Sequence, residues 1–355
     1  MKFLIAGGGT GGHVFPGIAI AQALKRKCSE PEILFVGTQS GFEAKAVPEY
    51  GFALENINVS GLKSKSPVEI IKALFRLPWA VVQSIQILRR FKPDMVIGVG
   101  GYASGPVLLA AWLLRYPRVI CEQNSVPGLT NRILGKLFVE HIWGAFSSAS
   151  AYFPKGRYLT FGNPLREEFM HRPLPRNSKN SMMILGGSRG ARPLNEMLPD
   201  ALGLIQDIIR DYPIIHQAGR KDVERVKRRY ESQGLQVQVS SFIDDMPKAY
   251  ESAKLVIARA GATTCAELTA MGVPSILIPF PQAADDHQTK NAEELVKAGA
   301  AVMVAQADCS VENLAGLIRH VLLDLKSLEN MANKARQIGK VNAADIVAQK
   351  VVELC

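Results

Sequence analysis

A histidine that follows a glycine-rich loop is the first group in this sequence that could do chemistry. The chain begins MKFLIAGGGTGGHVFPG, so the loop Gly7–Gly12 lies between a short apolar run and a helical segment, with His13 directly after it. A loop of this kind presents backbone N–H groups and a helix N-terminus to a phosphate. A histidine at that place can accept a proton as a general base, or it can cap the helix or be hydrogen-bonded in the core.

Two further glycine loops follow apolar runs later in the chain. They are GVGGYASGP at Gly98–Pro106 and GGSRGA at Gly186–Ala191. A tight turn would explain any one of the three loops. Three loops at strand ends indicate a ligand that carries several phosphates.

A dinucleotide cofactor fits the first loop poorly. Gly7, Gly9 and Gly12 satisfy the G-x-G-x-x-G pattern, but the next apolar run, ILFV, ends in Gly37, Thr38 and Gln39. The pattern requires an acidic residue at that end to hold a ribose hydroxyl. We therefore expect no nicotinamide or flavin cofactor.

Polar side chains after other strands suit a sugar nucleotide. Asn124 in CEQNSVPG either caps a helix or faces the ligand, and Glu267 in ATTCAEL either holds a ribose diol or complements the helix dipole. The segment 279–295 places many hydrogen-bonding side chains around a helix start. The aspartate pairs 244–245 and 285–286 are adjacent rather than spaced, which argues against a metal held by the protein.

Short β-branched runs alternate with helical segments, which predicts an α/β fold with parallel sheets. The expected strands are 3–6, 33–36, 95–99, 119–121, 182–185, 214–217, 237–240, 255–258 and 275–278. The opening KFLIAGGGTGGH is answered by MMILGGSRGARPLN at 182–195, and the segment 162–180 between them is rich in proline and basic residues. We therefore predict two doubly wound, Rossmann-like domains facing a cleft.

Composition narrows the class of protein. The chain has 355 residues, a net charge of +10 and five scattered cysteines without a C-x-x-C pair, which favours a reduced, cytosolic protein without disulfides. We expect no secretory signal and no spanning helix, because the longest apolar runs are too short. The basic charge favours a polyanionic partner, and the absence of nucleic-acid motifs argues against DNA or RNA.

The segment 61–94 is both basic and apolar. From Pro78, expected at the start of a helix, Val82, Ile85, Leu88 and Phe91 recur at helical spacing and are predicted to be core. Further apolar residues are harder to bury at once and are flanked by lysines and arginines; they are Ile71, Leu74, Phe75, Leu77 and Trp79. They form either a patch for an anionic membrane face or part of an ordinary core helix.

Seven segments together resemble the MurG family of bacterial glycosyltransferases: GGGTGGHVFPGIAIA, GGYASGP, EQNSVPGLTNR, GNPLR, GGSRGA, FIDDM and AADDHQTKNAEEL. The resemblance runs in order from about residue 3 to 300. It implies the GT-B fold, with an acceptor and membrane-facing domain at 1–162, a UDP-GlcNAc-binding domain at 163–335 and a C-terminal helix at 336–355 that crosses back. It also implies inverting transfer of GlcNAc from UDP-GlcNAc to the C4 hydroxyl of a muramyl-pentapeptide diphospho-undecaprenol, which completes lipid II in peptidoglycan synthesis.

The resemblance also assigns site residues. His13 is the implied base. The residues implied to bind UDP-GlcNAc are Thr10, Gly11, Gly12, Asn124, Arg166, Ser188, Ile243, Ala262, Thr263, Thr264, Glu267 and Gln288. The acceptor diphosphate is assigned to Gly9, Gly100, Gly101 and Ser104. No metal or other cofactor is expected to be obligatory, and stimulation by a divalent cation stays open.

The implied partners are UDP-GlcNAc, lipid I, an anionic phospholipid surface and cell-wall synthesis and division proteins, at the cytoplasmic face of a bacterial membrane. One position departs from the family, which usually has histidine before EQN where this chain has Cys121. A buried, inert thiol is one interpretation, and it leaves His13 as the proton acceptor. The alternatives are a GT-B transferase with another lipid acceptor, a UDP-GlcNAc 2-epimerase and a non-catalytic sugar-nucleotide sensor.

Overall fold

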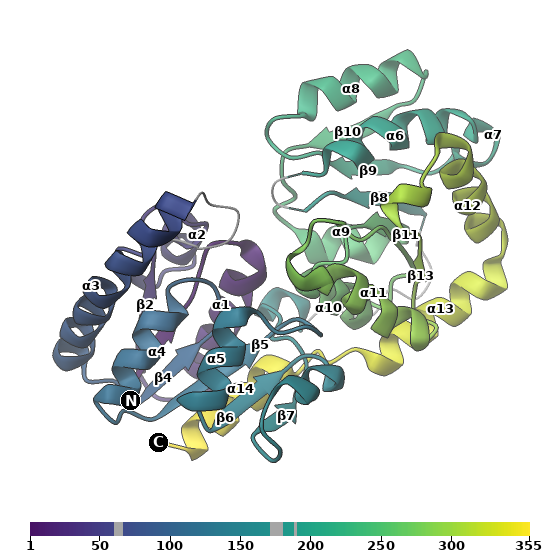
Figure 1. The fold of residues 1–355 in the computed structure, drawn as a ribbon. Coiled ribbons are helices and arrows are strands. Elements are labelled where there is room, and N and C mark those ends of the chain that lie inside the picture. Colours follow the sequence, from purple (N-terminus) through teal and green to yellow (C-terminus); the bar gives the residue numbers. More distant parts are fainter. Residues whose placement is uncertain (60–66, 171–179, 188–189) are drawn as a thin grey trace. The chain divides into compact units, whose positions relative to one another are not determined.

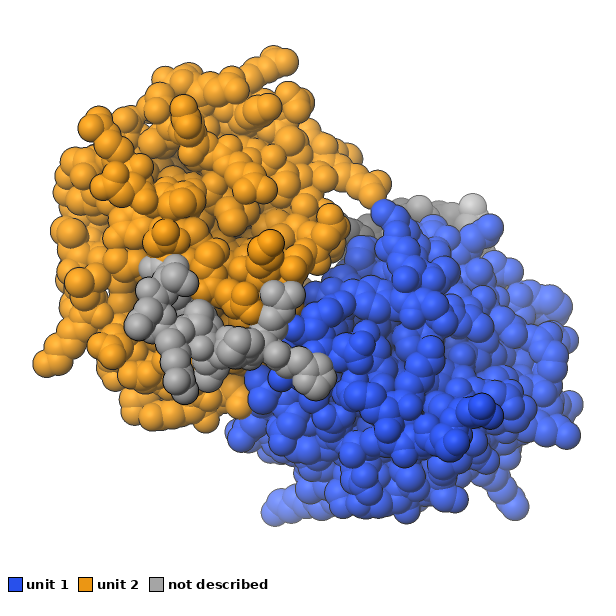
Figure 2. All heavy atoms as spheres, turned by 180° about the vertical axis from the view of Figure 1, so that it is seen from behind, with its two compact units in different colours: residues 1–170, 340–355 blue, residues 171–339 orange. Residues whose placement is uncertain are grey.

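The computed structural model describes residues 1–59, 67–170, 180–187 and 190–355, and for residues 67–76 it describes the backbone only. The chain divides into two compact units, residues 1–170 with 340–355 (unit 1) and residues 171–339 (unit 2) (Figure 2). Each unit is a parallel sheet covered by helices on both faces (Figure 1). The predicted α/β class with two Rossmann-like domains is confirmed.

The described part of unit 1 holds a seven-stranded sheet in the order β3-β2-β1-β4-β5-β6-β7, with every neighbouring pair parallel. The strands are β1 (Lys2–Ala6), β2 (Glu32–Gly37), β3 (Ala53–Asn56), β4 (Met95–Gly98), β5 (Arg118–Glu122), β6 (His141–Gly144) and β7 (Tyr158–Thr160). The helices are α1 (Gly11–Lys27), α2 (Glu43–Glu49), α3 (Pro67–Phe91), α4 (Ser104–Leu113), α5 (Leu129–Leu137) and α14 (Ala343–Glu353), with short 3-10 turns η1 (Ser147–Tyr152) and η2 (Glu167–Phe169).

The direction in which the chain winds decides which face each helix covers. Strands are added outward from β1 to β3 and then from β4 to β7 on the other side, and right-handed crossovers in opposite directions place their helices on opposite faces. The helices α1, α2 and α14 therefore pack on one face, whereas α3, α4 and α5 lie side by side on the other (Figure 1).

Unit 2 repeats this plan with a six-stranded sheet in the order β10-β9-β8-β11-β12-β13, counted over its described residues. Its strands are β8 (Ser181–Leu185), β9 (Ile214–Gln217), β10 (Val237–Ser240), β11 (Ala253–Ala258), β12 (Ser275–Leu277) and β13 (Val302–Met303). Its helices are α6 (Arg192–Gly203), α7 (Gln206–Ile209), α8 (Val223–Ser232), α9 (Met246–Ser252), α10 (Ala262–Ala270), α11 (His287–Lys297), α12 (Val311–Leu323) and α13 (Leu325–Ile338), with 3-10 turns η3 (Ala284–Asp286) and η4 (Gln306–Asp308).

The units divide later than the boundaries at 162 and 335 that the sequence suggested. The stretch up to Met170 belongs to unit 1, because Arg26 pairs with Glu167 at 2.8 Å and the backbone N–H of Glu167 donates to Gln22 at 3.2 Å. The last helix, α14, also belongs to unit 1: it packs on α1, and Asp345 pairs with Arg26 at 2.7 Å. Arg26 thus ties three separate segments of the chain together.

Helix α3 differs from its prediction. Pro78 lies inside the helix rather than at its start, and Val82 is 41% exposed rather than part of the core. Leu88 is fully buried as expected, and Ile85 is partly buried. Ala80 and Ile87 are buried in the core in place of Val82, so the buried face of the helix is rotated from the predicted one.

A buried histidine stabilises the core of unit 2. His216 on β9 is fully buried, with Nδ1 at 2.9 Å from the Tyr230 hydroxyl and Nε2 at 3.1 Å from Asn195 Oδ1. The amide nitrogen of Asn195 donates to the Ala218 carbonyl and to Asp222, so its oxygen accepts from His216 Nε2–H and Tyr230 donates to Nδ1. The network is complete only with a neutral ring, and burial lowers the pKa of His216 to about 3.

We therefore expect unit 2 to lose stability in mild acid. Between an ordinary pKa of about 6.5 and the folded value of about 3, the unfolded chain binds a proton that the folded chain does not. The free energy of unfolding should then fall by about 1.4 kcal/mol per pH unit below about pH 6.5, with no contribution from His216 above pH 7. Urea unfolding followed by circular dichroism at pH 7.5, 6 and 5 measures this slope.

The control is His216→Gln, which cannot titrate. The slope of its free energy of unfolding against pH should be smaller than the wild-type slope by about 1.4 kcal/mol per pH unit, even though the variant itself is less stable. An identical slope in the wild type and His216→Gln would show that His216 does not carry this pH dependence.

Candidate functional site

Unit 1 reverses its strand order between β1 and β4, and this is where an open α/β sheet places a ligand. The loops after β1, β4 and β5 leave the carboxyl edge of the sheet at this point. They contain Gly7–Thr10, Val99–Ala103 and Gln123–Gly128. Every residue of unit 1 that the sequence assigned to a ligand, apart from Arg166, lies in these loops or in the first turns of α1 and α4.

The first two loops interlock through glycines. The N–H of Gly8 donates to the Gly100 carbonyl at 3.3 Å. Gly101 has a positive φ of 81°, and a Cβ there would overlap the carbonyl oxygen of Gly8. At Gly100 a Cβ would lie 2.7 Å from His13 Nδ1. Glycine is therefore required at both positions so that the loops can meet beside His13.

His13 lies in the first turn of α1, partly buried, and does not cap the helix. Thr10 is the N-cap residue, and the Nδ1 atom of His13 is 3.1 Å from Gln123 Oε1. The first turn of α1 holds no acidic residue, so no carboxylate in that turn offsets the positive end of the helix dipole. Thr10 is exposed at this helix start, Gly12 and His13 are partly buried, and Gly11 is buried.

A buried carboxylate that the sequence analysis missed supports the first loop. Glu43 on α2 is 1% exposed and accepts hydrogen bonds from the N–H of Gly9 at 2.6 Å, the N–H of Thr38 at 2.8 Å and the Thr38 hydroxyl at 2.7 Å. A Cβ on Gly8 would overlap this carboxylate. Glu43 therefore fixes the end of β2 and the loop after β1 to each other.

Two residues assigned to the acceptor diphosphate have polar groups that are hydrogen-bonded within the protein. The N–H of Gly9 points inward to Glu43, so it is not available to a phosphate in this arrangement. Ser104 is fully buried. Its hydroxyl lies 2.7 Å from the Ala6 carbonyl and 2.9 Å from the Gly100 carbonyl, and these two acceptors share its one hydrogen. Both residues hold the loops in place instead of facing a ligand through these groups. The assignment of Gly9, Gly100, Gly101 and Ser104 to the acceptor diphosphate stays a prediction.

A second buried carboxylate organises the loop after β5. Glu122 is 2% exposed, and its Oε1 accepts from the backbone N–H of Asn124 at 2.9 Å and from its side chain at 3.3 Å. Its Oε2 accepts from Asn131 Nδ2 at 2.8 Å and from the Gly128 N–H at 3.3 Å. Asn124 is thus held in place by its neighbour and does not cap α5, whose N-cap is Gly128.

Cys121 is buried in the core beneath this loop. The residue is 2% exposed, and burial raises the pKa of its thiol to about 12. The thiol therefore stays protonated at neutral pH and is a poor proton carrier. The interpretation of this position as a structural thiol agrees with the geometry.

Arg166 lies in unit 1, away from the glycine loops along the chain, and is 6% exposed. Its guanidinium stacks 4.4 Å from the centre of the Phe15 ring and donates to the Tyr50 hydroxyl at 2.7 Å. These contacts fix the side chain, and its predicted contact with UDP stays a prediction.

Unit 2 has its own reversal of strand order, between β8 and β11. Gly187 and Gly190 both have positive φ, and a Cβ on Gly190 would overlap the Ala218 carbonyl. The side chain of Gln217 donates to the Gly187 carbonyl at 3.1 Å. Ser188, which the sequence assigned to the donor, lies outside the described residues.

The start of α10 faces the same edge. Ala262, Thr263 and Thr264 form its first turn, and Thr263 Oγ1 is buried without a hydrogen-bond partner among the described residues. Glu267 follows one turn later, 6% exposed, and accepts a hydrogen bond from the hydroxyl of the fully buried Tyr250 at 3.1 Å. Tyr250 is another residue that the sequence analysis missed.

Gln288 and Ile243 flank this edge. Gln288 Oε1 accepts from the Phe280 N–H at 2.9 Å, and Ile243 is partly buried after β10. Before α11, Asp285 and Asp286 both adopt left-handed conformations, with φ of 55° and 54°. Consecutive strained residues of this kind cluster at ligand sites.

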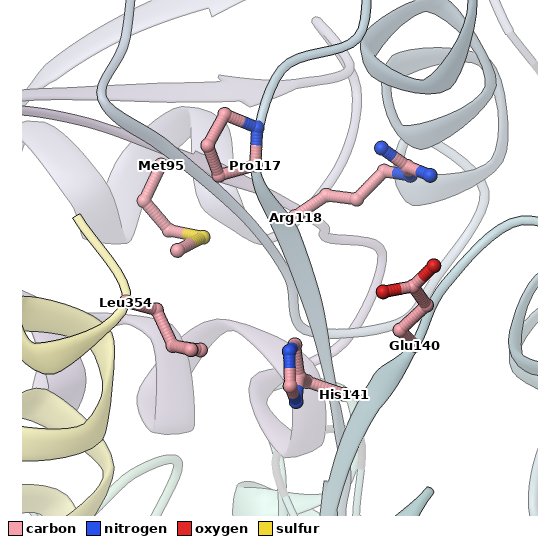
Figure 3. A pocket seen from close by; sticks show the side chains of 6 residues that line it. All are labelled: Met95, Pro117, Arg118, Glu140, His141 and Leu354. Atoms are coloured by element: carbon pink, nitrogen blue, oxygen red, sulfur yellow. The ribbon is translucent and has the colours of Figure 1, made fainter.

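A separate pocket opens at the opposite edge of the sheet in unit 1 (Figure 3). It has a volume of about 230 Å³ and is lined by Met95, Pro117, Arg118, Glu140, His141 and Leu354. Because it lies at the amino ends of β5 and β6, it is distinct from the glycine loops. The Nη1 of Arg118 donates a hydrogen bond to the Tyr116 carbonyl at 2.9 Å, so part of the guanidinium group is bonded to the neighbouring backbone.

The described residues contain no group of three or more His, Cys, Asp or Glu side chains that could hold a metal ion. Among the helices that the structure describes, none is both long enough and apolar enough to cross a bilayer.

Comparison with known proteins defines the class. Residues 3–140 match the glycosyltransferase family 28 N-terminal domain, and residues 181–349 match the family 28 C-terminal domain. Together with the two sheets, these matches establish a glycosyltransferase of the GT-B type.

The UDP-N-acetylglucosamine–N-acetylmuramyl-(pentapeptide) pyrophosphoryl-undecaprenol N-acetylglucosamine transferase of Myxococcus xanthus is 46% identical, over 100% of this chain and 93% of its own length. The enzyme of the same name from Syntrophus aciditrophicus is 45% identical over 98% of this chain and 97% of its own length. The crystal structure of Acinetobacter baumannii MurG is 32% identical, with a TM-score of 0.79 and coverage of 99% of both chains. The chain belongs to the MurG family of these transferases.

The epimerase alternative is not favoured. A UDP-GlcNAc 2-epimerase from Neisseria meningitidis shares the fold, with a TM-score of 0.69 over 99% of this chain and 100% of its own, but is only 13% identical. That likeness reflects the two-sheet architecture alone.

Replacement of Glu43 by glutamine tests the support of the first loop. The amide nitrogen would face a donor, so one buried N–H or hydroxyl would lose its acceptor, and the free energy of unfolding of unit 1 should fall by about 1–3 kcal/mol. All three tryptophans (Trp79, Trp112 and Trp143) lie in unit 1, so tryptophan fluorescence during urea unfolding measures this effect.

Glu49→Gln is the matched control on the same helix. Glu49 is exposed and pairs with Lys45 at 3.5 Å, so its loss should change stability by no more than about 0.5 kcal/mol. Equal effects of the two substitutions would contradict the special role of Glu43.

Proposed function

We propose that this chain transfers N-acetylglucosamine from UDP-GlcNAc to the C4 hydroxyl of the muramyl sugar of lipid I, with His13 as the general base. The observation that carries the proposal is the position of His13, whose ring lies where the α1 N-terminus and the glycine loops of unit 1 meet. The family relationship supports the choice of substrates, because the relatives' names specify them.

In the proposed reaction His13 takes the proton from the C4 hydroxyl as its oxygen attacks the anomeric carbon of GlcNAc. A new C4–O–C1 bond forms, the bond between C1 and the UDP oxygen breaks, and UDP leaves with the electron pair. Attack from the face opposite UDP inverts the configuration. The proposal assigns the transferred sugar to four residues of unit 1, which also contains His13: Thr10, Gly11, Gly12 and Asn124.

The proposal assigns the nucleotide to the carboxyl edge of the sheet in unit 2. Glu267, which Tyr250 holds in place, is suited to accept hydrogen bonds from the ribose diol. The start of α10, Gln288 and the backbone of Ile243 are assigned to the rest of the donor. Charge on departing UDP would be stabilised by the α6 N-terminus and by Ser188 and Arg166. No obligatory metal enters this scheme, so transfer should persist in a chelator, with stimulation by a divalent cation left open.

Replacement of His13 by glutamine tests the base. We expect kcat for transfer of labelled GlcNAc to a short-chain lipid I analogue to fall by about 10²–10⁴-fold, with little change in KM for UDP-GlcNAc. His141→Gln, in the pocket at the other edge of the sheet, should leave kcat unchanged.

The same assay distinguishes the alternatives. Full transfer by His13→Gln would preserve the transferase and exclude His13 as its base. Release of UDP or formation of ManNAc without acceptor, and no labelled lipid, would indicate the epimerase instead.

The proposal also places the chain at the cytoplasmic face of the bacterial membrane, on an anionic phospholipid surface, with cell-wall synthesis and division proteins as further partners. Exposed apolar side chains on α3, α4 and α5 support the membrane surface; they are Leu77, Trp79, Val82, Trp112, Leu113, Leu129, Ile133 and Leu137. Exposed basic residues on the same helices or directly after them include Arg89, Lys136 and Arg115. The described part of the structure does not include the other side chains of the basic, apolar segment: Lys63, Lys65, Ile71, Lys72, Leu74, Phe75 and Arg76.

A single charge on this surface should weaken membrane binding. Leu137 is 65% exposed, and we expect Leu137→Glu to lower binding to vesicles of phosphatidylglycerol and phosphatidylcholine by about tenfold or more in a sedimentation assay. Leu323 in unit 2 is 62% exposed and provides the matched control, Leu323→Glu. Equal binding by the two variants would exclude α5 from the membrane surface.

A further inference from the structure

The ring of His13 is hydrogen-bonded to a side chain to which the sequence analysis assigned no role. His13 Nδ1 lies 3.1 Å from Oε1 of Gln123, which is 1% exposed in the loop after β5. The two residues are 110 positions apart, and the reversal of strand order brings their loops together. A buried amide at hydrogen-bond distance from the proposed base can set where the proton of that base resides.

The second hydrogen bond of Gln123 determines which way its amide faces. Its Nε2 donates to the Cys121 carbonyl at 3.1 Å, so its oxygen is the atom that faces His13. An amide oxygen only accepts hydrogen bonds. In the neutral imidazole, Nδ1 therefore carries the hydrogen and Nε2 carries the free lone pair.

The opposite orientation of the amide is unfavourable. Rotation would set Oε1 against the Cys121 carbonyl, two acceptors facing each other in a buried place. Cys121 cannot adjust easily, because it lies in β5 and is 2% exposed. The orientation of Gln123 is thus tied to the central sheet.

The glycine loop closes the Nδ1 side of the ring. A Cβ on Gly100 would lie 2.7 Å from Nδ1, so the backbone of this loop passes too close to that nitrogen to leave room for a further side-chain atom between them. A substrate hydroxyl must therefore approach the other nitrogen, Nε2.

We infer that Gln123 is a positioning residue that fixes His13 as the Nδ1–H tautomer and so presents Nε2 as the proton acceptor for the attacking hydroxyl. The catalytic part of this inference rests on the proposed function of His13. Its structural part, the tautomer, does not depend on any substrate.

The first measurement is the tautomer itself, in the full chain without substrates. Nitrogen-15 NMR of histidine-labelled protein distinguishes a protonated Nδ1 from a protonated Nε2, and the spectrum of His13→Gln identifies the His13 signals among those of six histidines. We expect His13 to show a protonated Nδ1 and an unprotonated Nε2 in its neutral form. A protonated Nε2 in the wild type would overturn the inference.

Substitution of Gln123 then tests the cause. Gln123→Met has a similar shape without an acceptor, so protonated Nε2 should become populated and kcat for GlcNAc transfer to a lipid I analogue should fall by roughly 10–100-fold. KM for UDP-GlcNAc should change by no more than about twofold. Gln123→Glu keeps an acceptor for Nδ1–H but loses the donor to the Cys121 carbonyl, so it should keep the Nδ1–H tautomer while its free energy of unfolding falls.

Gln206→Met is the matched control, since it removes a side-chain bond to a carbonyl, at 2.7 Å, in unit 2. It should change neither the tautomer nor kcat. An unaltered His13 spectrum or wild-type kcat in Gln123→Met would overturn the role of Gln123. Full transfer by His13→Gln would instead overturn the base assignment, whatever the tautomer.

Discussion

The close approach of two glycine loops is the constraint on which the site in unit 1 depends. The hydrogen bond from Gly8 to Gly100 and the lack of a Cβ at Gly101 allow the loops after β1 and β4 to meet backbone to backbone. This contact leaves His13 beside Gly100, with its Nδ1 side closed and turned toward Gln123. A side chain at Gly100 would meet the His13 ring and one at Gly101 would meet the Gly8 backbone, so the position of the base depends on two residues that carry no side chain as well as on Gln123.

Buried carboxylates hold these loops from beneath. Glu43 bonds to Gly9 and Thr38, and Glu122 bonds to Asn124, Gly128 and Asn131. Each carboxylate accepts at least three hydrogen bonds, which lowers the cost of burying its charge. The consequence is that fewer N–H groups of the first loop face outward than the count of its glycines suggests, and the α1 N-terminus becomes its main anion-attracting feature.

The sequence predicted the architecture well and the supporting contacts poorly. The central strands follow from their apolar runs, whereas the strands that went unpredicted are short, lie toward the sheet edges or carry polar residues: β3, β6, β7 and β13. Nothing local separates Glu43 from Glu49 on the same short helix; only the fold shows that one is buried under Gly9 and the other exposed. Gln123 lies next to a predicted site residue, but its partner His13 lies 110 positions earlier in the first turn of α1, and a pairing over that separation leaves no periodic signal in the sequence.

The two strand–glycine–helix segments look alike in sequence, yet different groups lie behind their loops. In unit 1 the loop is backed by the Glu43 carboxylate, and in unit 2 by the neutral amide of Gln217, which donates to the Gly187 carbonyl. A negative charge behind a loop opposes an anion in front of it, whereas an amide does not. The two copies are therefore unequal in charge: a carboxylate lies behind the loop of unit 1, which holds His13 beside Gly100 and Gln123, whereas a neutral amide contacts the described part of the loop in unit 2.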